Sequence, residues 1–273
     1  MSKATLCIDI GGSKTRIGFS EDGRNFSDVK IFKTIADFDN QMGKIIKEAA
    51  SFGSKVDEVS IGTAGIVNRK EGKLVWWGQH ESWWGKSFFE PLKKIYSNAK
   101  FAIENDADIA CLGEAAFGAG KKYKIVAYVT LSTGIGGGLA INGKVPDYKV
   151  GFEVGHQIIN FRETATWSCG QKGCFESYAS GSAFKKIFGI SGEDCDDRDV
   201  WKEYGSMYLA PGIANLAAIW SPEVIVLGGG VSNKFDFFID PLKKELKKIL
   251  PFEMPEVVRA EFDEPGLYGG LAL

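Results

Sequence analysis

The chain has 273 residues and a net charge of -2, from 33 lysines and arginines against 35 aspartates and glutamates. No block of five or six like charges occurs, which argues against nucleic acid and against an anionic membrane as partners. No apolar stretch reaches the 18 residues of a membrane span, and five cysteines form an odd set in a chain too large to need disulfides. We therefore expect a cytoplasmic protein that acts on small molecules.

Hydrophobic periodicity predicts strand, tight turn, strand and helix in the first part of the chain. The helix is indicated by Phe38, Met42, Ile45, Ile46 and Ala49, which recur at helical spacing. We predict strands at residues 6–10, 15–20, 56–61 and 101–104, and helices at 38–49 and 107–117.

The second part of the chain repeats this order. We predict strands at 125–131, 139–142 and 224–227, a glycine loop at 132–138, and helices around 213–220 and 242–250, the last one ending before Pro251. Alanine and glycine become denser near residues 105–120, so we place a lobe boundary there. The expected division is a small α/β lobe of residues 1–107, to which 262–273 return, and a large α/β lobe of 108–261.

Glycine contributes 34 residues, where average usage would give roughly 19. Much of the surplus lies in four loops that follow predicted strands, at residues 9–12, 62–65, 133–138 and 228–230. Glycine lets the backbone turn and lets N–H groups approach an anion, so four such loops indicate phosphate binding more than tight turns alone. A P-loop is excluded because Ser13 replaces the glycine before Lys14, and a dinucleotide fingerprint because Leu139 holds its third glycine position.

Seven motifs in register along the chain resemble the ROK family of sugar kinases. They are Asp9-Ile10-Gly11-Gly12 with Lys14, Gly62-Thr63-Ala64-Gly65, Glu104-Asn105-Asp106-Ala107, Leu131-Ser132-Thr133-Gly134-Ile135-Gly136-Gly137-Gly138, Glu153-Val154-Gly155-His156, Cys169-Gly170-Gln171-Lys172-Gly173-Cys174-Phe175-Glu176 and Leu227-Gly228-Gly229-Gly230. The resemblance implies an α/β fold, namely the two-lobed actin-like ATPase (ribonuclease H-like) fold with mixed five-stranded sheets. It also implies ATP and Mg²⁺ as cofactors, a hexose substrate and a homodimer.

Asp106 stands where a predicted strand gives way to a helix. On the residues alone its carboxylate is equally well explained as a helix N-cap, which would stabilise the helix by about 0.5–2 kcal/mol. The resemblance implies that Asp106 is the general base that takes the proton of a sugar hydroxyl. It further implies that Gly65, Asn105, Glu153, His156 and Glu176 bind the sugar.

The ATP site is implied by the same resemblance. Asp9 would lie near Mg²⁺, which keeps waters and needs few protein ligands. Phosphate contacts are expected from Gly11, Gly12, Lys14, Thr133, Gly134 and Gly136, and adenosine contacts from Gly228, Gly229 and Gly230. On this basis, Gly134→Val should weaken ATP binding more than glucose binding.

A structural zinc is the least supported cofactor. The family usually binds zinc with one histidine and three cysteines, and here His156, Cys169 and Cys174 match while Trp167 takes the place of the first cysteine. A closed structural zinc site needs four ligands. We expect a loop held by packing without zinc, and three-ligand binding remains the alternative.

The resemblance implies ATP-dependent phosphorylation of the 6-hydroxyl of a hexose, glucose in the first place. N-acetylhexosamine or mannose is an alternative, because Phe152 departs from the family's small residue and Gln79 or His80 must replace an asparagine of its sugar loop. Four tryptophans between 76 and 84 lie in that region and could stack on a sugar. A sugar-binding transcription regulator is a second alternative. Such a protein needs an N-terminal DNA-binding helix-turn-helix, whereas here the predicted phosphate-binding strand–glycine–strand hairpin already begins at residue 6. Polyphosphate is an alternative donor to ATP.

Overall fold

The computed structural model describes residues 3–53, 55–78 and 80–273, so Gln79 lies outside the described residues. It divides into two compact units. Unit 1 comprises the described residues up to Phe117 with Lys144–Gly151 and Glu264–Leu273, and unit 2 comprises Gly118–Gly143 and Phe152–Asp263. The division falls after Phe117, and not after residue 107, because the helix that follows Asn105 packs on the C-terminal helix inside unit 1.

Unit 1 is built on a five-stranded mixed sheet with the order β3-β2-β1-β4-β7. Its strands are β1 (Thr5–Ile10), β2 (Lys14–Ser20), β3 (Asp28–Lys33), β4 (Glu58–Thr63) and β7 (Lys100–Asn105). The first three strands pair antiparallel, whereas β1, β4 and β7 run parallel. The carboxyl ends of these three parallel strands therefore meet at one edge of the sheet.

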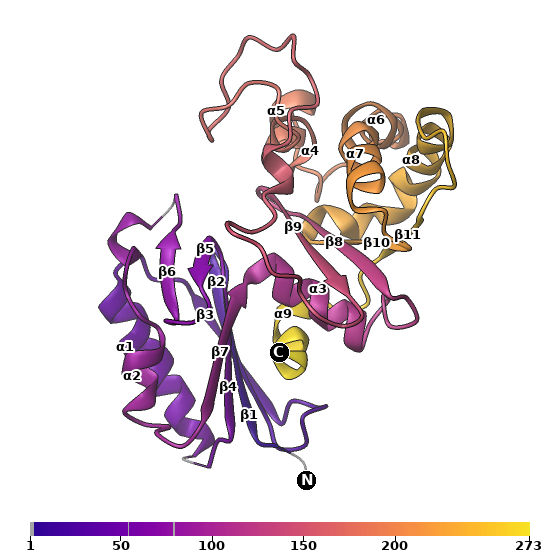
Figure 1. Ribbon diagram of the computed structural model, residues 1–273. Coiled ribbons are helices and arrows are strands. Elements are labelled where there is room, and N and C mark those ends of the chain that lie inside the picture. The colour runs from indigo at the N-terminus through magenta and orange to yellow at the C-terminus, as the bar shows by residue number, and fades with distance from the viewer. Residues whose placement is uncertain (1–2, 54, 79) are drawn as a thin grey trace. The chain divides into compact units, whose positions relative to one another are not determined.

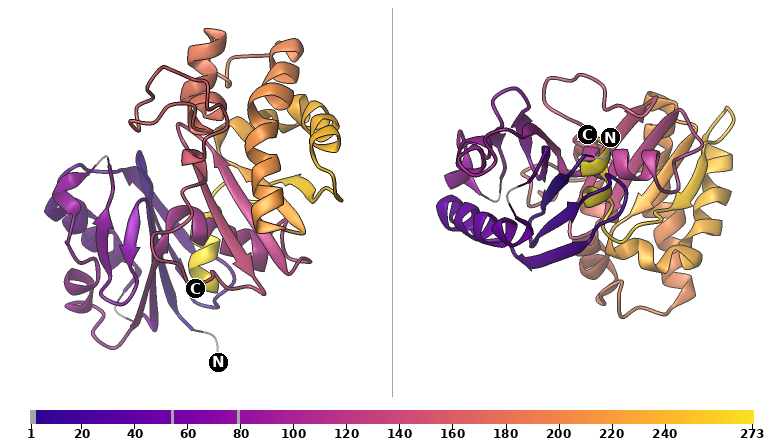
Figure 2. Two further views of the ribbon diagram at one scale, coloured as in Figure 1. Left: turned by 45° about the horizontal axis from the view of Figure 1, so that its top comes forward. Right: turned by 90° about the horizontal axis from the view of Figure 1, so that it is seen from below.

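Helices cover both faces of this sheet (Figures 1 and 2). They are α1 (Phe38–Ala49) and α2 (Phe89–Lys93) on one face, and α3 (Asp106–Ala116) and α9 (Pro265–Ala272) on the other. A two-stranded ribbon of β5 (Ile66–Asn68) and β6 (Lys73–Trp76) completes the unit. All six residues of β1 are buried, as expected for a strand in the middle of a covered sheet.

Unit 2 has a four-stranded sheet with the order β11-β10-β8-β9. Its strands are β8 (Ile125–Leu131), β9 (Ile135–Ile141), β10 (Val224–Gly228) and β11 (Glu256–Arg259). Our expectation of five strands is wrong for this sheet, as far as the described residues extend. After β9 the chain makes a 3-10 turn at Val154–His156 and then forms isolated bridges, between Ile158 and Cys174 and between Thr166 and Lys172, so the described residues add no third antiparallel strand to the sheet.

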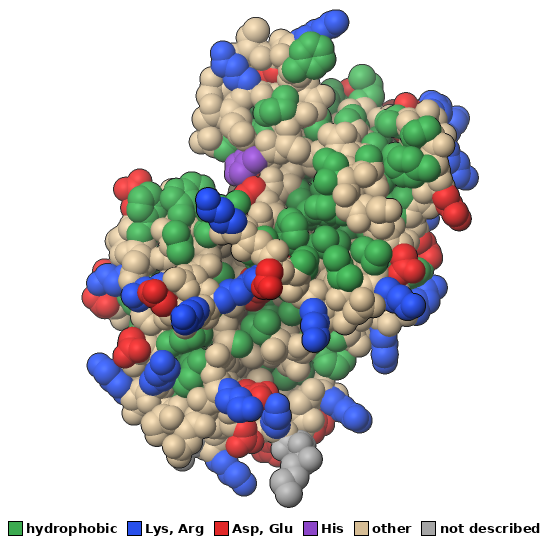
Figure 3. All heavy atoms as spheres, viewed as in Figure 1, with side chains coloured by type: hydrophobic (Ala, Val, Ile, Leu, Met, Phe, Trp, Pro, Cys, Tyr) green, Lys and Arg blue, Asp and Glu red, His purple; other side chains and the backbone are tan. Residues whose placement is uncertain are grey.

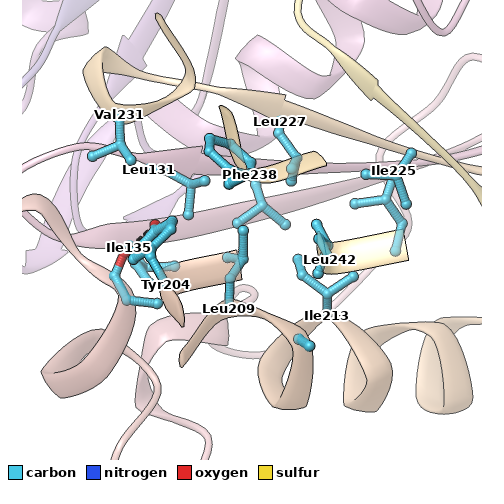
Figure 4. Packing of buried hydrophobic residues seen from close by; sticks show 14 of the residues in the cluster. Leu131, Ile135, Tyr204, Leu209, Ile213, Ile225, Leu227, Val231, Phe238 and Leu242 are labelled. Atoms are coloured by element: carbon cyan, nitrogen blue, oxygen red, sulfur yellow. Dashed lines mark hydrogen bonds between the residues drawn. The ribbon is translucent and has the colours of Figure 1, made fainter. Parts of the chain in front are cut away.

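The helices of unit 2 supply the apolar side chains that pack against its sheet. They are α4 (Glu176–Ala179), α5 (Gly181–Phe188), α6 (Arg198–Glu203), the π-helical segment Tyr204–Leu209, α7 (Ala210–Trp220) and α8 (Phe235–Ile249). Figure 4 shows Leu131 and Leu227 of the sheet among Tyr204, Leu209 and Phe238 of the helices. Both leucines and all three helical residues are fully buried.

The distribution of charged side chains on the surface agrees with the small net charge of the chain. On the face seen in Figure 3, positive and negative side chains are interspersed. Among the described residues no helix is both long and apolar enough to cross a membrane.

Candidate functional site

Asn105 and Asp106 lie at the junction of β7 and α3. The side-chain Oδ1 of Asn105 accepts hydrogen bonds from the backbone N–H of Ala107 at 2.9 Å and of Asp108 at 3.4 Å, so Asn105 is the N-cap of α3. Its Nδ2 donates to the carbonyl of Gly65 at 3.0 Å. The structure thus brings the predicted sugar residues Gly65 and Asn105 together, and the second N–H of the amide is the group that can donate to a sugar.

Asp106 is the first residue of α3 and is half-buried. Its Oδ1 accepts the N–H of Ala107 at 3.0 Å. Because Asn105 provides the cap, capping does not account for the carboxylate of Asp106. A carboxylate at a helix N-terminus is stabilised by the helix dipole, which holds it in place for chemistry.

Asp9 is the second carboxylate of this region and is 8% exposed. Burial raises its pKa to about 7; the Arg16 guanidinium, 3.3 Å from Oδ2, opposes the shift, and the charges of Asp106 and Glu264 add to it. Arg16 also pairs with Glu264, a residue that the sequence analysis did not identify. No pattern could have revealed it, because Arg16 and Glu264 are neighbours only in the fold.

The residues around Asp9 fit a magnesium ion. A buried carboxylate that is destabilised by a second carboxylate gains from a nearby cation, and Mg²⁺ typically takes one or two carboxylates together with waters and substrate phosphates. Among the described residues no group of three or more His, Cys, Asp or Glu could hold a metal by itself. Asp9 would therefore hold Mg²⁺ together with phosphate oxygens.

The glycine loops of the implied ATP site differ in what their backbones offer. The N–H of Gly11 donates to the Lys14 carbonyl at 3.0 Å, which closes the β1–β2 turn and engages that amide. Gly136 lies inside β9 opposite Thr130, so the predicted loop at 132–138 is wrong from Ile135 onward. The other residues predicted to contact phosphate or adenosine are Gly12 and Lys14 in unit 1 and Thr133, Gly134, Gly228, Gly229 and Gly230 in unit 2.

Gly229 is required by the backbone. Its φ is +82°, in the region that L side chains rarely adopt, and a Cβ there would lie 2.5 Å from the Leu131 carbonyl oxygen. This glycine lets the end of β10 turn directly against the end of β8.

Glu153, His156 and Glu176 gather within unit 2. The Nε2 of His156 lies 3.7 Å from Oε2 of Glu153, and Nδ1 of His156 is buried without a hydrogen-bond partner. Burial raises the pKa of Glu153; the His156 ring opposes the shift and the Glu176 charge adds to it. An unpaired ring nitrogen beside two carboxylates suits a polyhydroxyl ligand, which can donate and accept at neighbouring positions. The ring of Phe152, which stands where the family has a small residue, packs against the ring of Trp220, with centroids 4.9 Å apart.

Glu176 is held by two donors. Its Oε2 accepts the backbone N–H of Ile135 at 3.0 Å, and its Oε1 accepts Nε1–H of Trp167 at 3.2 Å. Trp167, which stands at the place of the family's first zinc cysteine, thus provides a hydrogen bond to a residue that we predict to bind the sugar. The sequence analysis missed this role because it treated Trp167 as the loss of a zinc ligand and did not consider its indole N–H as a hydrogen-bond donor.

Gly134→Val is expected to weaken sugar and ATP binding together. A Cβ on Gly134 would lie 2.5 Å from Oε2 of Glu176, so any side chain displaces the carboxylate from the Ile135 amide. We therefore revise the expectation of an effect mainly on ATP, and predict that KM for sugar and for ATP each rise at least about tenfold, since lost charge-assisted hydrogen bonds cost about 1.5–3 kcal/mol. Steady-state kinetics would test this, with Gly43→Ala in helix α1 as a control, because a Cβ there meets nothing within 4 Å. An unchanged sugar KM would contradict it.

The cysteine loop contains two neighbouring thiols. The Sγ atoms of Cys169 and Cys174 are 3.6 Å apart. Within the described residues His156 does not join them in a metal-binding group. The absence of zinc remains a prediction.

The tryptophan segment in unit 1 is partly core and partly surface. Trp77 and Trp83 are buried, Trp76 and Trp84 are 41% and 42% exposed, and the His80 ring stacks on Trp83 with centroids 4.9 Å apart. Burial lowers the pKa of His80, so its ring tends to be neutral. Trp76 and Trp84 are therefore the aromatic faces available to a ligand.

The order and direction of the strands in the two sheets identify the fold. The sheet of unit 1 begins with three antiparallel strands and continues with parallel strands, and the sheet of unit 2 is a shorter version of it. This arrangement is the actin-like ATPase fold. The model of the ROK family matches residues 5–273, and the chain belongs to this family.

Three relatives show how far the similarity extends. The glucokinase of Streptomyces coelicolor is 30% identical over 90% of this chain and 88% of its own. The N-acetyl-D-glucosamine kinase of Haemophilus influenzae is 28% identical over 97% of each. The crystal structure of a ROK family glucokinase from Streptomyces griseus, in complex with glucose and AMPPNP, superimposes with a TM-score of 0.83 at 26% identity and covers 98% of both chains.

Proposed function

We propose that this protein transfers a phosphoryl group from ATP to the 6-hydroxyl of a hexose, glucose in the first place, with Asp106 as general base. As a ROK family member with kinases as relatives over most of its length, the chain is a sugar kinase. The observation that supports the finer proposal is the β7–α3 junction, where Asn105 is the N-cap and Asp106 is the half-buried first residue of the helix.

The chain's own residues supply each requirement of the reaction. Asn105, Gly65, Glu153, His156 and Glu176 orient the sugar through hydrogen bonds. The Asp106 carboxylate accepts the proton of the attacking hydroxyl, which makes the oxygen a better nucleophile toward the γ-phosphorus. Asp9 would hold Mg²⁺, which neutralises phosphate charge when it is bound.

N-acetylhexosamine is the second candidate substrate, because the relative from Haemophilus influenzae is named an N-acetyl-D-glucosamine kinase. The same amide, carboxylates and imidazole could bind the hydroxyls that it shares with glucose. What distinguishes the two sugars is the 2-substituent, and Phe152 does not decide between them because its ring packs on Trp220.

A coupled phosphorylation assay over a sugar panel would test the substrate. We expect kcat/KM for glucose to exceed that for mannose, N-acetylglucosamine and N-acetylmannosamine by at least about tenfold, since one unpaired buried polar group costs about 1–3 kcal/mol. Replacing ATP by GTP or polyphosphate in the same assay tests the donor. Turnover of N-acetylmannosamine well above glucose would contradict the glucose assignment, and no turnover of any sugar would contradict the function.

A further inference from the structure

The segment Lys144–Gly151 belongs to unit 1, although the chain on both sides of it belongs to unit 2. Tyr148 is the residue that anchors it. The Tyr148 hydroxyl lies 2.7 Å from Oε1 of Glu104 and 2.5 Å from Oδ2 of Asp108, and the Arg69 guanidinium lies 4.1 Å from the centroid of the Tyr148 ring. One phenol thus contacts two carboxylates and one cation.

The two carboxylates flank the pair Asn105 and Asp106 and are buried, with Glu104 2% and Asp108 0% exposed. Oε1 of Glu104 accepts the backbone N–H of Asn105 at 2.9 Å. The backbone N–H of Asp108 donates to the capping oxygen of Asn105 at 3.4 Å. Movement of the Glu104 carboxylate is therefore transmitted to the Asn105 backbone, and movement of the Asp108 main chain to the Asn105 cap beside Asp106.

The Tyr148 hydroxyl is a donor at neutral pH. Burial and the charges of Asp108 and Glu104 raise the pKa of the phenol, so it keeps its proton. Two buried carboxylates that reach for the same oxygen repel each other, and a hydroxyl between them offsets part of this cost. Arg69, whose Nε lies 2.7 Å from Oε2 of Glu104, compensates one of the two charges.

We propose that Tyr148 is a positioning residue, which holds Glu104 and Asp108 and through them fixes Asn105 and Asp106 for sugar phosphorylation. The inference rests on the proposed function.

Tyr148→Phe tests the proposal, since it removes the hydroxyl and keeps the ring under Arg69. We expect kcat with ATP and glucose to fall about tenfold and the sugar KM to rise, because a small misplacement of a catalytic group is costly. The ATP KM should stay within about twofold, a split that a merely structural role would not produce. Tyr123→Phe is the matched control, because it removes a hydroxyl that contacts the Glu256 carboxylate in unit 2.

A second variant follows the route through the carboxylates. Adding Asp108→Asn to Tyr148→Phe removes one charge and supplies an amide donor, so kcat should recover at least about threefold relative to Tyr148→Phe. No recovery, or a Tyr148→Phe variant with the kinetics of the parent, would overturn the proposal while the parent enzyme remains active. A parent that phosphorylates no sugar would overturn the proposed function and this inference with it.

Discussion

Replacing Asp106 by asparagine is expected to lower kcat by at least about 10³-fold, because the amide cannot accept the proton of the attacking hydroxyl. Sugar affinity should change only a few-fold, since asparagine has the same shape and keeps an oxygen for the Ala107 N–H. A coupled assay measures kcat, and calorimetric titration with sugar measures binding. A general base acts on the chemical step, so the loss should appear in kcat and not in the affinity for the sugar.

The helix start makes this experiment interpretable. Because Asn105 caps α3, Asp106→Asn leaves the cap in place and removes a charge near the helix dipole, which is worth about 0.3–1 kcal/mol, together with the repulsion between Asp106 and Asp9. Asp39→Asn, at an exposed first-turn position of α1, is the matched control for that charge. It should leave kcat unchanged. A rate near that of the parent for Asp106→Asn would refute the assignment of the base.

The elements with strong hydrophobic periodicity could be predicted from the sequence. The strand at 125–131 and the helix at 38–49 have the predicted bounds. The edge strand β3 was missed although Val29 and Ile31 alternate with Lys30 in it; the segment is short, and most of its residues are exposed at the edge of the sheet. The missing third antiparallel strand of unit 2 could not be predicted either, because strand pairing depends on where the chain after β9 turns.

The sequence indicated candidate site residues, but it could not show which hydrogen bonds their polar groups make. The motif around Asn105 and Asp106 left two explanations for Asp106, a helix N-cap or a general base, and the structure shows that the cap is Asn105. The amide of Gly11 is similarly engaged within its own turn. Tyr148 carried no sequence signal, because its partners Glu104 and Asp108 are 44 and 40 residues away along the chain.

Asp9→Asn is expected to stabilise the metal-free protein at alkaline pH while impairing catalysis. The pKa of Asp9 is about 7 in the folded chain against an ordinary value of 3.8, so between these values the folded state holds a proton that the unfolded state has released. The contribution of the protonated form is complete below about pH 4 and is lost as the pH rises through about 7, a difference on the order of 4 kcal/mol. The neutral amide of asparagine does not undergo this loss.

The two proteins should therefore have similar stabilities at about pH 4, where the contribution is complete, and the variant should gain as the pH rises to 8. Denaturant unfolding in EDTA at both pH values measures this difference, and adding Mg²⁺ is the control, because a cation at the ionised carboxylate should shrink the gain. The same variant should lose kcat/KM, since we propose that the Asp9 carboxylate serves phosphate and metal binding at the expense of stability. A variant that is no more stable than the parent at pH 8 would show that Arg16 fully compensates Asp9, and the charge of Asp9 would then need no cation to explain it.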